Sequence, residues 1–187
     1  MSTKTKWEID SSHSEIAFKV KHLMLINVKG VFTEYNSSIY TTGDDLNTAE
    51  IDFWMNPNSL KTNDEKRDEH LRSVDFFDTK NHKEITFRSN TVEKKEDNQY
   101  EMWGDLTIKG ITKRIKLDVE SSGIQKDPWG NEVAGITVTG KLNRKDWELN
   151  WNTALESGGV LVGDTVNISC ELELKKQVEE PVAQSSK

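Results

Sequence analysis

Residues 100–108 read Tyr-Glu-Met-Trp-Gly-Asp-Leu-Thr-Ile, and this stretch decides the fold class. From Tyr100 onward every second residue is apolar or glycine, while most residues between them are charged or polar. Such a period of two is typical of an antiparallel strand with one face on an apolar interior and the other in water. We therefore predict a half-buried strand here.

The same alternation recurs along most of the chain, so the protein is predicted to consist mainly of strands. The strongest alternation lies in residues 16–22, 49–55, 134–142 and 166–174, and weaker strands are predicted near 28–40, 84–93, 113–121 and, as a short segment, 147–151.

Turn sequences separate these segments. Thr-Gly-Asp-Asp at 42–45 and Lys-Gly at 109–110 are typical of hairpin connections, and Asp-Pro-Trp-Gly at 127–130 has Pro and Gly where a type I turn favours them. About eight or nine strands in meander order within one short domain favour a closed barrel or a sandwich. The predicted fold class is therefore all-β.

One segment lacks the period of two. Residues 62–65, Thr-Asn-Asp-Glu, have the spacing of a capping box with Thr62 as N-cap, and good helix formers follow. We predict a short helix over residues 63–71. Its apolar content is almost only Leu71, so we expect it to lie across the end or mouth of the sheet, followed by the aromatic pair Phe76-Phe77.

Composition excludes several classes of protein. The 187 residues carry a formal net charge of −7, which argues against a nucleic-acid binder and against a polybasic membrane anchor. Only 34% of residues are hydrophobic, but six Trp, six Phe and three Tyr argue against a disordered chain. No segment reaches the ~20 apolar residues of a membrane span, and the first residues lack the apolar region of a secretory signal. We therefore expect a cytoplasmic protein.

The domain organisation is predicted to be simple. Residues 1–176 form one domain, and residues 177–187, which are polar, form a flexible tail. The single cysteine, Cys170, rules out an internal disulfide and an all-cysteine metal site, and we expect it to be a small buried residue.

Candidates for chemistry are few. The four histidines show no zinc-ligand spacing, and no G-x-S-x-G elbow or phosphate loop is present, so we expect no catalytic residue, no metal and no cofactor. His22 is interpreted as a hydrogen-bonded histidine at the barrel end, with ligand contact as the alternative. His70 is interpreted as a contact from helix to barrel or as a ligand contact. Four carboxylates lie near the helix: Asp64, Asp68, Asp75 and Asp78. We expect them to form a solvated surface with salt bridges to the cations interleaved with them.

Small residues share the inward rows with large ones. Gly104, Gly140, Ala49 and Ala134 alternate in register with bulky apolar residues. One interpretation is that they leave room for a ligand inside an eight-stranded barrel, and the other is that the glycines mark bulges or bends.

Several motifs resemble those of the YceI-like family. Residues 7–18 match its opening W-x-I-D-x-x-H-S-x-I-x-F, and residues 62–78 look like its T-x-N-x-x-R-D-x-H-L-x-S-x-x-F-F-D block. Residues 104–113 resemble its G-x-L-T-I-K-G-V-T-K hairpin, and residues 143–146 fit its N-R-x-D signature. The resemblance extends from about residue 7 to residue 174.

The resemblance implies an extended, lipocalin-like antiparallel barrel of eight strands with the short helix near its mouth. The lumen would bind and carry a long isoprenoid chain, such as a polyprenyl phosphate or a prenylated quinone, without catalysis. The polar head would meet Arg67, His70 or Asn63 at the mouth. The expected ligand-binding residues are Phe18, Val20, His22, Phe32, Ile51, Phe53, Asn63, Arg67, His70, Leu71, Phe76, Phe77, Phe87, Met102, Leu106, Ile136, Val138 and Trp151.

Two other functions stay open at this point. The first is an enzyme that acts on a bound lipid or a small electrophile through His22, His70 or a nearby Asp. The second is a stress-response interaction module whose lumen is filled by side chains. The sequence also leaves open whether the chain forms a homodimer.

Overall fold

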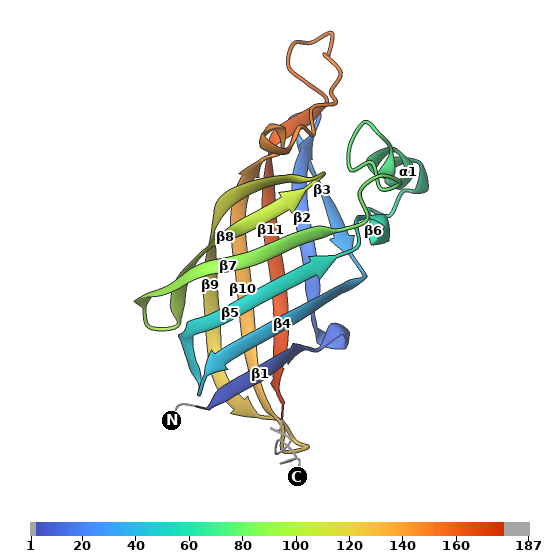
Figure 1. The fold of residues 1–187 in the computed structure, drawn as a ribbon. Helices are drawn as coiled ribbons and strands as arrows, with labels where there is room; N and C mark the ends of the chain where they lie inside the picture. The colour runs from blue at the N-terminus through green and yellow to red at the C-terminus, as the bar shows by residue number, and fades with distance from the viewer. Residues whose placement is uncertain (1–2, 178–187) are drawn as a thin grey trace, which may run out of the picture.

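Residues 3–177 are described by a computed structural model, and they form a closed, eight-stranded antiparallel β-barrel with a short α-helix at one end (Figure 1). The predicted all-β class and the eight-stranded barrel are confirmed. The tail predicted for 177–187 lies, apart from Gln177, outside the described residues. None of the helices within residues 3–177 has the length and apolar character needed to cross a membrane.

The strands follow the alternating segments of the sequence, with bounds that differ by a few residues. They are β1 Lys4–Ile9, β2 Glu15–His22, β3 Ile26–Phe32, β4 Tyr35–Thr42, β5 Asp45–Met55, β6 Leu60–Lys61, β7 Ile85–Glu96, β8 Gln99–Ile108, β9 Ile111–Lys126, β10 Glu132–Asn143 and β11 Val162–Lys176. The helices are α1 Glu65–Arg72 and the 3-10 turns η1 Ser11–His13, η2 Pro57–Ser59 and η3 Arg144–Trp147.

The ring runs in the order β1-β4-β5-β7-β8-β9-β10-β11 and closes where β11 pairs with β1. β11 is long enough to pair along the same edge with β2 over Val162–Glu171 and with β1 over Leu174–Lys176. The chain turns between these two strands through η1, so β1 continues the ring while β2, β3 and β6 extend the sheet beyond it.

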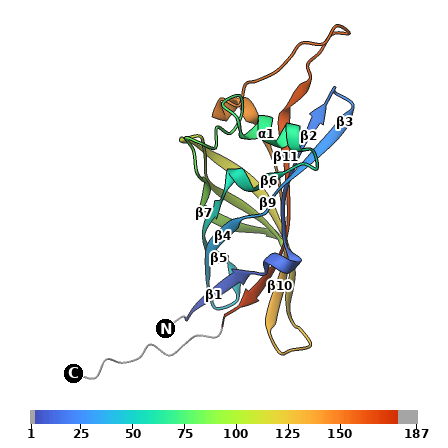
Figure 2. The ribbon, with the colours of Figure 1, turned by 90° about the vertical axis from the view of Figure 1, so that its right-hand side faces the viewer.

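The two ends of the barrel differ. α1, η3 and the loop 148–161 lie at one end together with the β2–β3 turn, and we call this the helix end (Figures 1 and 2). The β4–β5 and β9–β10 turns lie at the opposite end, beside the start of β1 (Figure 1). Because the strands are antiparallel, every connection falls at one end or the other and leaves the interior to side chains.

Two strand predictions need correction. The segment 28–40 is not one strand: it is interrupted at Thr33 and Glu34, whose backbone N–H groups donate to Ser59 Oγ at 3.1 and 3.0 Å, and it belongs to β3 and β4. The short strand expected at 147–151 is wrong, because Arg144 binds the carbonyls of Leu149 and Trp151 that a strand would use for its ladder.

The predicted start of the helix is also wrong. α1 begins at Glu65, and its N-cap is Asp64, whose side chain accepts from the Arg67 N–H at 3.1 Å. Asn63 has a positive φ of 64°, which a helical residue does not adopt, so Thr62 cannot cap the same helix. A single-sequence pattern cannot distinguish these two N-cap candidates, since Thr and Asp both satisfy the same backbone donors.

Candidate functional site

An elongated cavity of about 600 Å³ occupies the inside of the barrel. Its walls are the inward-facing rows of the alternating strands, and nearly all of the lining side chains are aliphatic or aromatic. Two almost fully buried tryptophans line it: Trp7, from β1, donates to Thr41 Oγ1 at 2.9 Å, and Trp147, from η3, donates to the Leu106 carbonyl at 3.1 Å. The space is therefore largely apolar, and the indole N–H groups of both tryptophans are already paired.

The predicted ligand-binding residues, with one exception, line this cavity. Asn63 does not: its side chain is exposed to solvent at a residue of positive φ, although its neighbours Thr62 and Asp64 both line the cavity. The part of the predicted residues in ligand binding stays a prediction. Those found in the lining are Phe18, Val20, His22, Phe32, Ile51, Phe53, Arg67, His70, Leu71, Phe76, Phe77, Phe87, Met102, Leu106, Ile136, Val138 and Trp151.

Sequence reasoning missed several lining residues. Trp7 and Ile9 flank Glu8 in β1 with the same period of two, and that alternation was a usable signal. Leu149, Leu161 and Val162 carry no such signal, because they reach the lumen from an irregular loop and its junction with β11.

The glycines do not create the empty space. A Cβ atom added to Gly140 would lie 2.6 Å from Leu117 Cδ2, and one added to Gly104 would collide with the ring of Phe87. Gly30 is covered in the same way by the ring of Phe18. The expectation that Gly104 and Gly140 leave room for a ligand is therefore wrong: side chains from neighbouring strands already lie over them.

Polar groups gather where the cavity meets the helix end. Asp64 and Lys66 are exposed and also line the cavity, so it opens to solvent beside α1. Arg67 donates from Nε to Thr62 Oγ1 at 2.8 Å and from Nη2 to the Thr62 carbonyl at 2.6 Å. Its Nη1 has no hydrogen-bond partner among residues 3–177, so the guanidinium is held in place with donors to spare.

The carboxylates around α1 differ from the predicted salt-bridged surface. Asp68 is only 6% exposed and accepts from the backbone N–H and the hydroxyl of Thr62 at 2.9 and 2.6 Å. Asp64 caps α1, and Asp78 accepts from Asn81. Within the described chain these carboxylates form no ion pair with the four interleaved cations, which are Lys66, Arg67, Arg72 and Lys80. The reason is that these acids satisfy local N–H and O–H donors, which no charge pattern reveals.

The two histidines at the opening occupy different settings. His70 Nε2 lies 2.9 Å from Asp75 Oδ2, and its ring meets Trp151 edge-on with centroids 4.5 Å apart. His70 therefore joins α1 to the segment that follows it and also lines the cavity, while its contact with a ligand stays a prediction. His22 ends β2 and lines the cavity. Its ring has no hydrogen-bond partner among residues 3–177, so the interpretation as a hydrogen-bonded histidine is wrong, and a ligand contact stays a prediction.

Arg144 organises the loop above the cavity. It is buried, and it donates to the carbonyls of Gly163 and Trp151 at 2.9 Å and to that of Leu149. Burial lowers the pKa of this guanidinium, while Asp164, 3.7 Å away, opposes that shift. Arg144 thus positions Trp151, and the N-R-x-D motif marked the residue without revealing this use.

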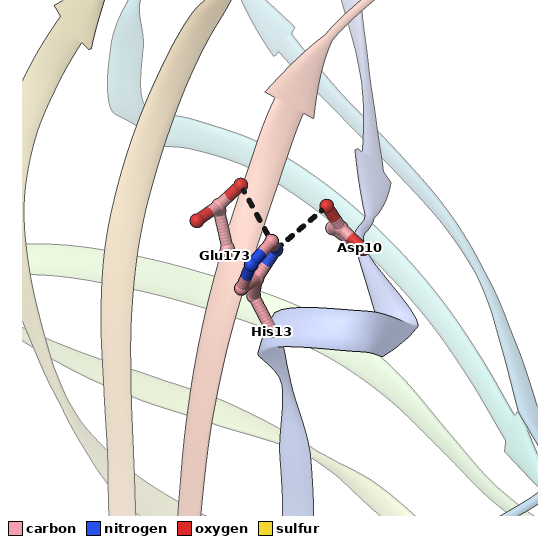
Figure 3. A group of neighbouring side chains, drawn as sticks. All are labelled: Asp10, His13 and Glu173. Atoms are coloured by element: carbon pink, nitrogen blue, oxygen red, sulfur yellow. Dashed lines mark hydrogen bonds and ion pairs between the residues drawn. The ribbon is translucent and has the colours of Figure 1, made fainter. Parts of the chain in front are cut away.

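A second polar cluster lies outside the barrel, where β1 ends beside β11. His13 Nδ1 is 3.1 Å from Asp10 Oδ2 and 3.8 Å from Glu173 Oε1 (Figure 3). The Lys175 ammonium lies 2.7 Å from the same Asp10 oxygen and holds the pKa of that carboxyl far below its usual range. A cation already occupies this cluster, so its evident use is to tie the closing strands together.

Comparison with known proteins agrees with this architecture. The family model described as the YceI-like domain matches residues 7–174. The UPF0312 protein SERP2314 of Staphylococcus epidermidis is 41% identical over 170 residues, which cover 90% of this chain and 96% of that protein.

Solved structures share the barrel. A YCEI protein of Campylobacter jejuni matches with a TM-score of 0.73 and 31% identity, covering 84% of this chain and 90% of that chain. A polyisoprenoid binding domain from Saccharophagus degradans matches with a TM-score of 0.61 and 14% identity, covering 91% and 98%, which shows a common fold. With its motifs, its barrel and these matches along nearly its whole length, the chain belongs to the YceI-like family.

Proposed function

We propose that this protein binds and carries a long isoprenoid-type lipid inside the barrel without converting it chemically. The observation that carries the proposal is the apolar cavity of about 600 Å³. This volume lies within the range of about 300–1,000 Å³ typical of ligand sites. Burial of apolar surface contributes ~25 cal/mol per Å², so a long chain gains affinity with few polar contacts.

The cavity also suggests how such a lipid is oriented. Its lining is apolar toward the β4–β5 end, while Lys66, Arg67 and His70 stand at the helix end. A phosphate or quinone head therefore fits at α1, where Arg67 Nη1 and the Lys66 ammonium can donate to its oxygens. The isoprenoid chain then extends along the lumen past Phe53 and Met102.

The likeness of fold to a domain described as binding polyisoprenoids supports the same class of ligand. The largely apolar lining favours carriage over catalysis, and the His70–Asp75 pair at the helix end ties α1 to the segment that follows it.

Mass spectrometry of an organic extract of the purified protein tests the proposal. We expect a co-purified isoprenoid lipid, or saturable uptake of an added polyprenyl phosphate or prenylated quinone by lipid-free protein. Neither co-purification nor uptake would favour a lumen that only packs the fold, and a lipid whose mass changes on incubation would favour an enzyme.

Two variants test the orientation. Lys66→Gln should weaken retention of the phosphate-headed lipid more than that of the quinone, because it removes an exposed charge at the opening. Lys80→Gln is the matched control, since Lys80 is also exposed and does not line the cavity. Equal effects of the two variants would contradict a head group at α1.

A further inference from the structure

The tip of the β2–β3 hairpin exposes a run of large apolar side chains. Leu25 and Ile26 are 81% and 64% exposed, and Leu23 and Met24 beside them are exposed as well. These four consecutive apolar residues, 23–26, are called the hairpin tip. Apolar surface gathered in one place, unlike single scattered residues, marks an interaction site.

The backbone of the hairpin tip is also unfavourable for these residues. Leu23 and Met24 have positive φ values of 55° and 60°, and the Leu25 N–H closes the turn on the His22 carbonyl at 3.1 Å. Gly, Asn or Asp are preferred at such positions, because a Cβ atom crowds the backbone carbonyl there and only a short polar side chain offsets this by local hydrogen bonds. Large apolar residues here serve neither the turn nor the core, which points to a use outside the folded chain.

The hairpin tip adjoins the opening of the cavity. His22 and Lys21, which precede it, line the cavity, and the Leu23 N–H donates to the Leu161 carbonyl at 2.9 Å. The hairpin and the loop 148–161 project together beyond the barrel at the helix end (Figure 2). Whatever covers the hairpin tip therefore lies against the mouth of the lumen.

The charge around the hairpin tip is opposite to that of the whole chain. The net charge is −7, yet residues 16–33 contain three lysines and no acidic residue. Lys19 and Lys29 are direct cross-strand partners. The Lys29 ammonium pairs with Glu15 Oε1 at 2.5 Å, whereas Lys19 and Lys21 form no ion pair among residues 3–177 and leave two positive charges beside the hairpin tip. With Glu148 and Glu156 of the adjoining loop 148–161 included, the three lysines still outnumber the two acidic residues.

We propose that the hairpin tip inserts into the surface of an anionic lipid bilayer and places the cavity mouth against it. This inference rests on the proposed function, because a lipid carrier must meet the membrane that supplies or receives its cargo. A stable protein partner normally covers about 800 Å² on each side, far more than a four-residue protruding turn offers. Apolar side chains flanked by lysines fit the interface of an anionic bilayer instead.

Vesicle sedimentation with lipid-free protein tests this docking. The vesicles contain equal parts of phosphatidylcholine and phosphatidylglycerol, with no isoprenoid, so binding to them does not depend on the cargo. We expect the protein to co-sediment with these vesicles, and binding to fall in pure phosphatidylcholine or in high salt. The double variant Leu25→Ser/Ile26→Ser should lower the affinity for these vesicles by about tenfold or more.

The opposite end of the barrel provides the matched control. Trp129 on the β9–β10 turn is 83% exposed, so Trp129→Ser removes a similar apolar side chain and should leave vesicle binding unchanged. A further variant, Lys19→Gln/Lys29→Gln, should weaken binding to the anionic vesicles only. The residues replaced in the two double variants do not line the cavity, so both variants should take up an isoprenoid added in detergent as the unmodified protein does.

Each outcome decides the matter. Vesicle binding that depends on the hairpin tip supports docking, and it does so even if no isoprenoid is ever taken up, in which case only the proposed function fails. Absence of vesicle binding by the unmodified protein, or equal loss in Trp129→Ser, overturns the docking. A hairpin variant that changes the oligomeric state instead of vesicle binding overturns it as well, and assigns the hairpin tip to a second copy of the chain.

Discussion

Replacement of Arg144 by Met is expected to destabilise the protein more than any change of an exposed charge. Arg144 Nε donates to the Gly163 carbonyl at 2.9 Å, its Nη1 donates to the carbonyls of Trp151, also at 2.9 Å, and Leu149, and its Nη2 reaches the Val162 carbonyl at 3.3 Å. Met has a similar length and fills the same space, so the loss is mainly of these bonds rather than of packing.

The magnitude follows from those contacts. Hydrogen bonds from a charged donor contribute about 1.5–3 kcal/mol each, but carbonyls of a surface loop regain water when the guanidinium is removed. The desolvation that lowers the pKa of Arg144 is also relieved by the substitution. We therefore expect a net loss of about 3 kcal/mol in the free energy of unfolding, which corresponds to roughly 6–12 °C in Tm for a chain of this size.

Denaturant unfolding of lipid-free protein measures this loss, and Lys145→Met is the control. Lys145 is exposed and lies 3.3 Å from the same Asp164 carboxylate, so its removal should cost less than about 1 kcal/mol. Arg144→Lys should resemble Arg144→Met, because one ammonium cannot reach carbonyls on both sides of the loop. A loss below about 1 kcal/mol in Arg144→Met would refute the role given to this residue in holding the loop.

Three further changes test other parts of the structure. Gly140→Leu should lower the free energy of unfolding by about 1–3 kcal/mol, because the new side chain meets Leu117, and an unchanged thermal melt would instead place open space there. Thr62→Val should cost about 1–3 kcal/mol in denaturant unfolding, since it removes the hydroxyl donated to the buried Asp68, while Thr62→Ser should recover most of it. Burial raises the pKa of the Cys170 thiol to about 11 from 9.0, so the unfolded chain loses this proton first and stability should fall as pH rises from about 9 to 11. Cys170→Ala should remove that part of the pH dependence in urea unfolding, and an unaltered profile would argue against a thiol shielded in the lumen.

The strand pattern was predictable because its physical cause is local. In residues 100–108 successive side chains point to opposite faces, so a strand with one wet face must alternate whatever surrounds it. The same reasoning identified many of the residues that line the cavity, because the inward face of a closed sheet is the lumen. Turn sequences at 42–45 and 109–110 then placed the hairpins correctly.

Errors occurred where two candidates for one local role stood close together. Thr62 and Asp64 are both suitable N-caps, and the choice depended on Asp68, which turns inward and binds the Thr62 hydroxyl. The path of the loop 148–161 also depends on contacts between distant residues, since Arg144 donates to the Trp151 carbonyl within the loop and to the Gly163 carbonyl after it. Such contacts form only after the surrounding elements are in place.

By itself, the sequence determined the all-β class, the inward rows and the family resemblance, because alternation and turn chemistry act over a few residues. Only the tertiary structure decided where the space inside the barrel lies. Gly140 and Gly104 appear as gaps in their own strands, yet Leu117 and Phe87 from neighbouring strands fill them. Cavity volume depends on how side chains from several strands share one interior, and no single strand contains that information.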